Sequence, residues 1–148
     1  MVLPDFREDG WLPEGHYDTS WEEVVDRFSG SPGSTRERVA RSLLNWRNEV
    51  KAKGVSGWLL LDGSFVSAKE NPSDFDALLG IDEEAREILE KDIEARSLLD
   101  YIECKSLGFD LLYYFAATVR DYPDLAGLDL WDRDTETGKL KGVLEVWL

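Results

Sequence analysis

The sequence predicts an α/β (α+β) fold, a mixed β-sheet with helices packed on it. A long amphipathic segment leads into a short apolar run bounded by glycines, and a segment of alternating acidic and apolar residues follows. A second helical pattern then leads to a further apolar run. Helix and strand periodicities that alternate in this way are typical of helices packed on one sheet. The 148 residues are enough for one domain but not for two independent cores.

The chain is strongly acidic, with 31 Asp and Glu residues against 17 Lys and Arg residues and a net charge of −14. Such a surface repels nucleic-acid phosphates, so tight binding to long DNA or RNA is not expected. Two interpretations of the charge stay open, namely solubility alone or a basic protein partner. No apolar run reaches the roughly 20 residues that cross a bilayer, and Met1–Asp9 has no signal-peptide pattern. Because Cys104 is the single cysteine, we expect a cytoplasmic protein without internal disulfides.

Residues 1–18 are expected to form an irregular arm, because proline and glycine recur in this segment. The only histidine, His16, lies in the arm, where a structural hydrogen bond is a simpler role for it than general-base catalysis. Large apolar side chains predict that the arm packs on the single domain formed by residues 19–148: Phe6, Trp11 and Leu12.

Two amphipathic helices are predicted after the arm. The first covers Trp21–Phe28 and follows directly on a threonine and a serine that can cap it. The second begins after Ser34, whose side chain can cap the helix while Glu37 occupies the reciprocal position. Its arginines, Arg36 among them, are expected to face solvent. Its apolar residues recur at helical spacing and form one stripe: Val39, Leu43, Trp46 and Val50.

The rest of the chain alternates strands and helices. A strand buried on both faces is predicted over Trp58–Leu61, because this apolar run lies between two glycines. Near the C-terminus, Thr137-Gly138 predicts the turn of a C-terminal β-hairpin. Cys104 is expected to be a core residue in a strand or loop. The other predicted elements are a strand over Asp74–Ile81, a helix over Glu83–Leu99, a strand over Phe109–Phe115, a turn or helix over Ala116–Tyr122, and hairpin arms over Leu128–Asp132 and Gly142–Leu148.

Most of the candidate functional residues lie in and around the segment between the two central predicted strands. Gly63 directly follows the buried strand and allows the backbone to turn and to approach a ligand. Ser64 then offers a hydroxyl and a backbone N–H to phosphate oxygens. Asp74 and Asp76 are two residues apart, so in a strand both carboxylates project from the same face.

Paired carboxylates favour a divalent cation between them, and Mg²⁺ prefers oxygen ligands. Asp110 is the best candidate for a third ligand, because a lone aspartate among the apolar residues of a predicted strand is otherwise hard to explain. The structural alternative is an aspartate that caps a backbone amide at the end of a strand.

The pattern of an apolar strand, Gly63-Ser64, a nine-residue gap and Asp74-x-Asp76 resembles the active-site signature of the DNA polymerase beta-like nucleotidyltransferase superfamily. The small standalone members of that superfamily are closest in size. The resemblance implies that Gly63 and Ser64 hold the phosphates of a nucleoside triphosphate and that Asp74 and Asp76 ligate Mg²⁺. Asp110 matches the third acidic position, which implies that it completes the metal site and activates an acceptor hydroxyl.

Two further features bear on this resemblance. Many superfamily members carry an arginine in the gap, where this chain has Lys69, which can meet a phosphate as a point charge, and Glu70. The N-terminal Leu12–His16 and the C-terminal Lys141–Glu145 are also similar to an uncharacterised bacterial family with the same core. That second likeness brings no activity with it.

Two functions follow as hypotheses. The first is a Mg²⁺-dependent enzyme that transfers a nucleoside monophosphate from a nucleoside triphosphate to a hydroxyl of a protein, a small molecule or a nucleic-acid end. The second is a catalytically inactive binding protein of the same fold, for instance the acidic partner in a toxin–antitoxin or defence pair. The net charge of −14 motivates the second hypothesis.

Overall fold

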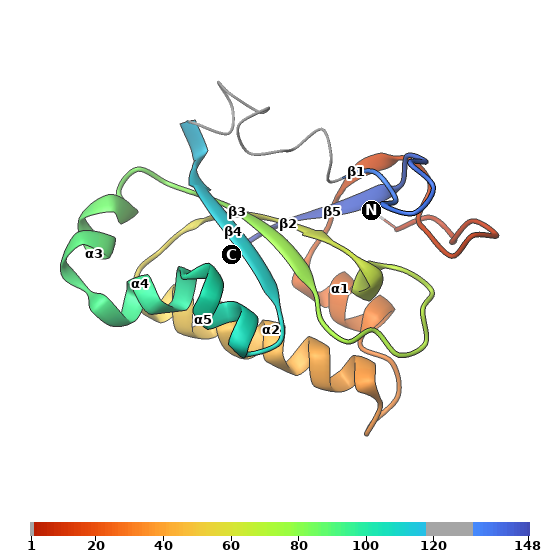
Figure 1. The fold of residues 1–148 in the computed structure, drawn as a ribbon, viewed down its shortest axis with the longest axis horizontal. Coiled ribbons are helices and arrows are strands. Elements are labelled where there is room, and N and C mark those ends of the chain that lie inside the picture. Colours follow the sequence, from red (N-terminus) through yellow and green to blue (C-terminus); the bar gives the residue numbers. More distant parts are fainter. Residues whose placement is uncertain (1, 118–131) are drawn as a thin grey trace.

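The computed structural model describes residues 2–117 and 132–148. Its strands are β1 (Gly15–Asp18), β2 (Gly57–Asp62), β3 (Asp76–Ile81), β4 (Asp110–Phe115) and β5 (Gly142–Trp147). They form one mixed sheet in the order β1-β5-β2-β3-β4 (Figure 1). The β1/β5 and β3/β4 pairs are parallel, whereas β2 is antiparallel to both of its neighbours. The predicted α/β (α+β) class is confirmed.

The helices of the described residues are α1 (Trp21–Phe28), α2 (Thr35–Ala52), the 3₁₀ helix η1 (Ser64–Val66), α3 (Ala85–Lys91), α4 (Ile93–Leu99) and α5 (Tyr101–Ser106). In Figure 1, α1, α2, α4 and α5 lie on one side of the sheet. The predicted caps of the first two helices are present, because the backbone N–H of Glu23 donates to Ser20 Oγ and that of Glu37 donates to Ser34 Oγ, each at 3.1 Å.

Strand alternation gives the sheet two faces with separate apolar clusters. On the face toward the helices, the strand residues belong to the main core: Leu59, Leu61, Ala77, Leu79, Leu111 and Leu144. On the opposite face, Leu60, Leu78 and Val143 form a smaller cluster. The run predicted as a strand buried on both faces is therefore confirmed as the centre of the sheet.

The single helix predicted over Glu83–Leu99 was wrong, because the structure divides it into α3 and α4. The break is at Asp92, which has φ −113° and ψ 105° and accepts hydrogen bonds from two backbone N–H groups in the first turn of α4. Aspartate competes with the helical backbone in this way and favours a cap over a helix interior. Asp100 caps α5 by the same chemistry, where no helix was predicted. Cys104 lies in this helix rather than in a strand or loop, and burial raises the pKa of its thiol to about 12.

The irregular arm predicted over residues 1–18 was wrong at its end, because Gly15–Asp18 form the edge strand β1. Residues 2–14 contain no helix or strand, and their side chains Leu3 and Leu12 are buried. The side chain of His16 lies on β1, with Nδ1 3.0 Å from a carboxylate oxygen of Glu145. This contact is the structural hydrogen bond that the sequence predicted.

The strand β5 lies between β1 and β2, which occupy both of its edges. Before it, the chain turns and makes one antiparallel bridge between Arg133 and Leu140. Residues 128–131 of the predicted hairpin and residues 118–122 of the predicted turn or helix lie outside the described residues. In the described part of the chain, no helix is both long enough and apolar enough to cross a membrane.

Candidate active site

Three aspartates lie next to one another across β2, β3 and β4. Asp62 at the end of β2 pairs in register with Asp76 at the start of β3, and Asp76 pairs with Asp110 at the start of β4. Their side chains project from the sheet face that is opposite to the helices, because the adjacent residue of each strand enters the main core (Leu61, Ala77 and Leu111). The carboxylates therefore form a row across three neighbouring strands.

Asp74 joins this row from just outside the sheet. One carboxylate oxygen from each of Asp74, Asp76 and Asp110 lies within 4.8 Å of the other two. The strand predicted from Asp74 was two residues too long, because neither neighbouring strand extends past Asp76 to pair with the earlier residues. Between the two carboxylates, Phe75 turns into the core and its ring stacks on Phe109 with centroids 4.6 Å apart. The backbone of the aspartate pair is thus anchored from the helical side.

The carboxylates of this cluster oppose one another electrostatically. Burial raises the pKa of Asp76 to about 7, together with the hydrogen bond to Asp110 and the negative charges of its aspartate neighbours. Burial and the charge of Asp110 also raise the pKa of Asp74, while the nearby Lys105 and Lys69 lower it. A cluster in this state gains by binding either a proton or a cation.

A cation of the protein itself contacts one member of the cluster. The ammonium Nζ of Lys105, on α5, lies 2.7 Å from Asp110 Oδ1, and this ion pair raises the pKa of Lys105. About half of the Lys105 side chain is exposed, so solvent screens the pair. Lys105, which approaches from α5, therefore offsets the negative charge of Asp110 only in part.

The bend after β2 brings the backbone against these carboxylates. Gly63 has φ 81°, in the left-handed region, and a Cβ at this position would collide with the carboxylate of Asp76. Glycine is therefore required here both for the turn and for the close approach. The 3₁₀ helix η1 begins at the next residue, Ser64, which lines the same cavity as Asp76.

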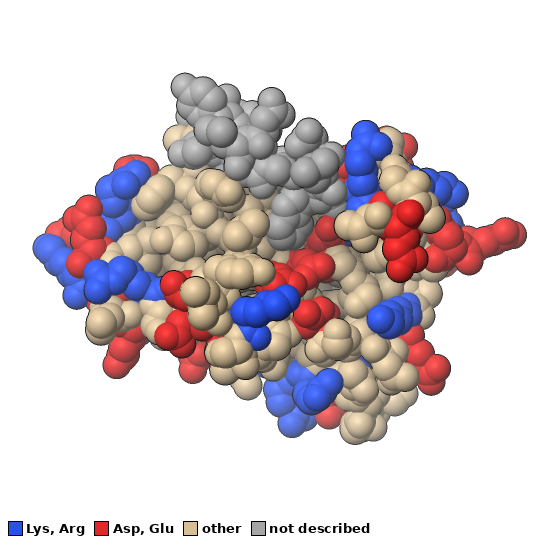
Figure 2. Space-filling view, viewed as in Figure 1, with Lys and Arg blue, Asp and Glu red and all other residues tan. Residues whose placement is uncertain are grey.

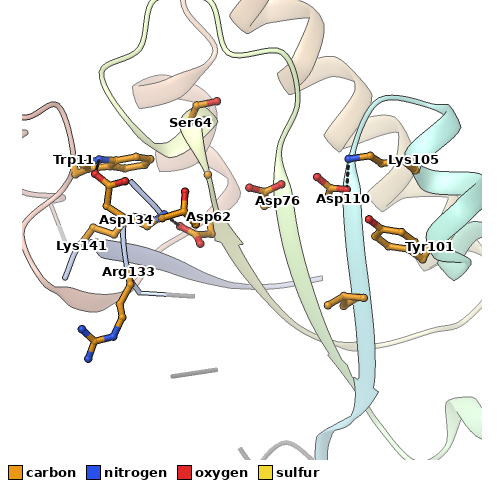
Figure 3. A pocket seen from close by; sticks show the side chains of 13 residues that line it. Trp11, Asp62, Ser64, Asp76, Tyr101, Lys105, Asp110, Arg133, Asp134 and Lys141 are labelled. Carbon is orange, nitrogen blue, oxygen red and sulfur yellow. Dashed lines mark hydrogen bonds and ion pairs between the residues drawn. The ribbon is translucent and has the colours of Figure 1, made fainter. Parts of the chain in front are cut away.

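A cavity of about 500 Å³ opens over the aspartate row. Figure 3 shows the carboxylates of Asp62, Asp76 and Asp110 side by side across its middle, with Ser64 above them. The two ends are bounded by residues that are far apart in sequence, with Trp11, Asp134 and Lys141 at one end and Tyr101 and Lys105 at the other. A cavity of this volume is within the range of small-molecule sites.

Sequence reasoning missed the pair formed by Asp62 and Lys141. The ammonium Nζ of Lys141 lies 2.6 Å from Asp62 Oδ1, and both side chains are at least nine-tenths buried. The indole ring of Trp11 covers Lys141, with its centroid 4.2 Å from Nζ. Burial raises the pKa of Asp62, and the Lys141 ammonium opposes that rise. The alternation from Leu60 places Asp62 on the site face, but no sequence signal links it to Lys141.

Arg36 was also missed, because the sequence predicted that it faces solvent. Its guanidinium is partly buried under the bend and donates hydrogen bonds to backbone carbonyls of η1 and the following loop. Burial lowers the pKa of Arg36. By contrast, Lys69, predicted to meet a phosphate, is exposed and lines an adjoining hollow that it shares with Ser64 and Trp11.

The surface around the site carries both signs of charge. On the face shown in Figure 2, acidic residues are spread among basic ones, and no broad basic patch covers the described part of this face. Nucleic-acid-binding surfaces collect Lys and Arg on one face to meet the phosphate backbone. The visible surface has no such footprint.

A family of known sequences matches nearly the whole chain. Residues 4–147 match a family described as "Family of unknown function (DUF6932)". The chain belongs to this family. No curated protein and no solved structure matches the chain. For this DUF6932 protein, the chemistry of the site is therefore inferred from the arrangement of its side chains.

The aspartate cluster offers the kind of donor atoms that a hard divalent cation binds. Its three carboxylates supply only oxygen ligands, which Mg²⁺ prefers over nitrogen or sulfur. Asp76 and Asp110 are paired in register, so β3 and β4 fix their spacing, and Asp74 lies two residues before Asp76, just outside the sheet. The three carboxylates are close enough together to hold a metal ion; Asp76 and Asp110 line the same cavity as the Gly63–Ser64 bend, and Asp74 lines a separate hollow.

Proposed function

We propose that this DUF6932 protein is a Mg²⁺-dependent nucleotidyltransferase that moves a nucleoside monophosphate from a nucleoside triphosphate to a hydroxyl acceptor. One observation carries the proposal: Asp74, Asp76 and Asp110 offer carboxylate oxygens within 4.8 Å of one another, and two of them, Asp76 and Asp110, line one cavity with the Gly63–Ser64 bend. Phosphoryl transfer needs positioning and neutralisation of negative charge more than covalent help from the protein.

The proposal gives each residue of the site a role. Gly63 and Ser64 bind the β- and γ-phosphates through backbone N–H groups and the hydroxyl. Asp74 and Asp76 hold Mg²⁺, which when bound would neutralise the carboxylates and the triphosphate. Asp110 completes the metal site and accepts the proton of the acceptor hydroxyl. The acceptor oxygen then bonds to the α-phosphorus as the bond to pyrophosphate breaks, and pyrophosphate leaves.

Calorimetric titration with ATP and CTP in the presence of Mg²⁺ tests the proposal. We expect heat of binding for the wild type and its loss in Asp74→Asn/Asp76→Asn, because the metal bridges the aspartates and the phosphates. Glu87→Gln/Glu90→Gln on α3 is a matched control, since it removes two exposed carboxylates away from the cavity. Equal heats in the wild type and the aspartate variant would refute the proposal.

The inactive binding protein is the second candidate, and the net charge of −14 favours it. It predicts that a basic protein co-purifies with the chain and that no label passes from a radiolabelled nucleoside triphosphate to any acceptor in a lysate. Label transfer that is lost in Asp110→Asn would exclude this candidate, because transfer requires an acceptor-activating group.

A further inference from the structure

Arg36 is the side chain that holds the bend beside the aspartate cluster from behind. It lies in the first turn of α2, and its guanidinium donates to five different carbonyl oxygens. Four of these belong to the segment that follows Gly63, and the fifth is at the end of α1. The acceptors and distances are Phe65 O at 2.7 Å, Ser67 O at 2.5 Å, Lys69 O at 2.5 and 2.9 Å, Ser64 O at 3.4 Å and Phe28 O at 3.1 Å.

The position of the Arg36 guanidinium lowers stability unless its hydrogen bonds to the bend compensate. A cation in the first turn of a helix opposes the helix dipole, and a partly buried guanidinium loses hydration. The carbonyl oxygens offset both costs, because each hydrogen bond to a charged donor is stronger than one between neutral groups. One arginine therefore fixes the backbone direction of residues 64–69.

The direction matters for ligand binding. In a trans peptide the N–H points opposite to the C=O, so carbonyls that face Arg36 turn the following N–H groups away from it. The N–H groups of Val66 and Ala68 donate to carbonyls within the protein, which leaves the N–H of Phe65, directly after Ser64, for a ligand. Ser64 lies in this fixed segment and lines the cavity over the aspartates. Anion sites built from successive backbone N–H groups depend on such a fixed peptide orientation.

We propose that Arg36 is a positioning residue that keeps the Gly63–Ser64 bend in the conformation that receives a triphosphate. The inference rests on the proposed function, because it assigns the phosphates to this bend. Arg36 does not line the cavity and acts through the backbone. Its removal must therefore weaken phosphate binding without changing the metal affinity of the aspartates.

Two probes separate these effects. Mn²⁺ alone reports the metal affinity of the aspartates. Magnesium tripolyphosphate reports phosphate binding at the bend, and because it lacks a nucleobase its binding does not depend on base preference. We expect Arg36→Met to weaken tripolyphosphate binding about tenfold or more and to leave Mn²⁺ affinity within about twofold. Arg36→Lys keeps the charge but not the planar fork of donors, so its loss should be intermediate. If Arg36→Met does not fold, Arg36→Lys carries the same test.

Arg27→Met is the matched control. Arg27 is also partly buried and its guanidinium also donates to backbone carbonyls, but these belong to Leu3 and Pro4 and not to residues 64–69. Unchanged tripolyphosphate affinity in both Arg36 variants, or an equal loss in Arg27→Met, would overturn the role of Arg36 alone. A wild type that binds Mn²⁺ but no tripolyphosphate and no ATP would overturn the proposed function together with this inference.

Discussion

At the edge of the sheet where β2 ends and β3 and β4 begin, the two faces differ in chemistry although they share the same backbone. Toward the helices, the side chains of Leu61, Ala77 and Leu111 are fully buried in the main core. One residue away in each strand, the opposite face carries an aspartate, and the pKa of the central one is raised to about 7. At this edge the helical face stabilises the fold, whereas the buried aspartates on the opposite face lower its stability; further along the strands, that face is also apolar, with Leu60 and Leu78.

The first prediction tests the helical face. Leu79 in β3 is fully buried in the main core. Leu79→Ala should lower the free energy of unfolding by about 3 kcal/mol, because it removes apolar contacts and leaves a cavity. Urea denaturation measures the change, and Mn²⁺ affinity should stay close to that of the wild type under conditions where the variant is folded. A loss below about 1 kcal/mol would show that this face is not a tightly packed core.

The second prediction tests the aspartate face, where a substitution should raise the free energy of unfolding instead of lowering it. A shift of the Asp76 pKa from 3.8 to about 7 means that the folded state binds more protons than the unfolded state in this window. Stability therefore falls as pH rises from about 4 to 7. Asp76→Asn should raise the free energy of unfolding at pH 8 in EDTA by about 2 kcal/mol, roughly half of what the full shift implies, because solvent reaches part of the side chain.

Thermal denaturation of Asp76→Asn and the wild type at pH 4 and pH 8 measures this gain. The gain should be small at pH 4, where the wild-type carboxyl is largely protonated in the folded state. Destabilisation by Asp76→Asn at pH 8 in EDTA would contradict this prediction, because it would mean that the Asp76 carboxylate stabilises the fold.

The third prediction concerns metal binding at this face. Because Asp76 has a pKa of about 7 without metal, it must lose a proton when it ligates a cation. The apparent affinity for Mn²⁺ should therefore rise up to about tenfold per pH unit below pH 7, equivalent to about 1.4 kcal/mol, and level off above it. Titrations between pH 5.5 and 8.5 show this curve, and a flat profile would place the metal at other ligands.

The sequence predicted the side of the sheet on which most of these residues lie, because strand periodicity is local. Phe75 between two aspartates and Asp110 after Phe109 already indicate which side chains enter the core. The break at Asp92 could not be foreseen from periodicity, because apolar residues at helical spacing continue across it from Ile88 and Leu89 to Ile93, while the Asp92 side chain caps the next helix.

Long-range partners were beyond the sequence. Lys141 reaches Asp62 only because β5 pairs with β2, and Arg36 reaches the bend only because α2 packs beneath it. Arg36 was predicted to face solvent and Lys141 had no predicted partner, yet each is held by oxygen atoms from a distant segment. The capping signal of Asp100 and Glu103, in contrast, was present in the sequence and would have located α5.

A crystal of the protein soaked with a non-hydrolysable nucleoside triphosphate analogue and Mg²⁺ tests the central claim most directly. The account predicts metal density bound by the carboxylates of Asp74, Asp76 and Asp110, with the β- and γ-phosphates against Gly63 and Ser64. Metal density at other residues, or a nucleotide whose phosphates lie away from this bend, would contradict it.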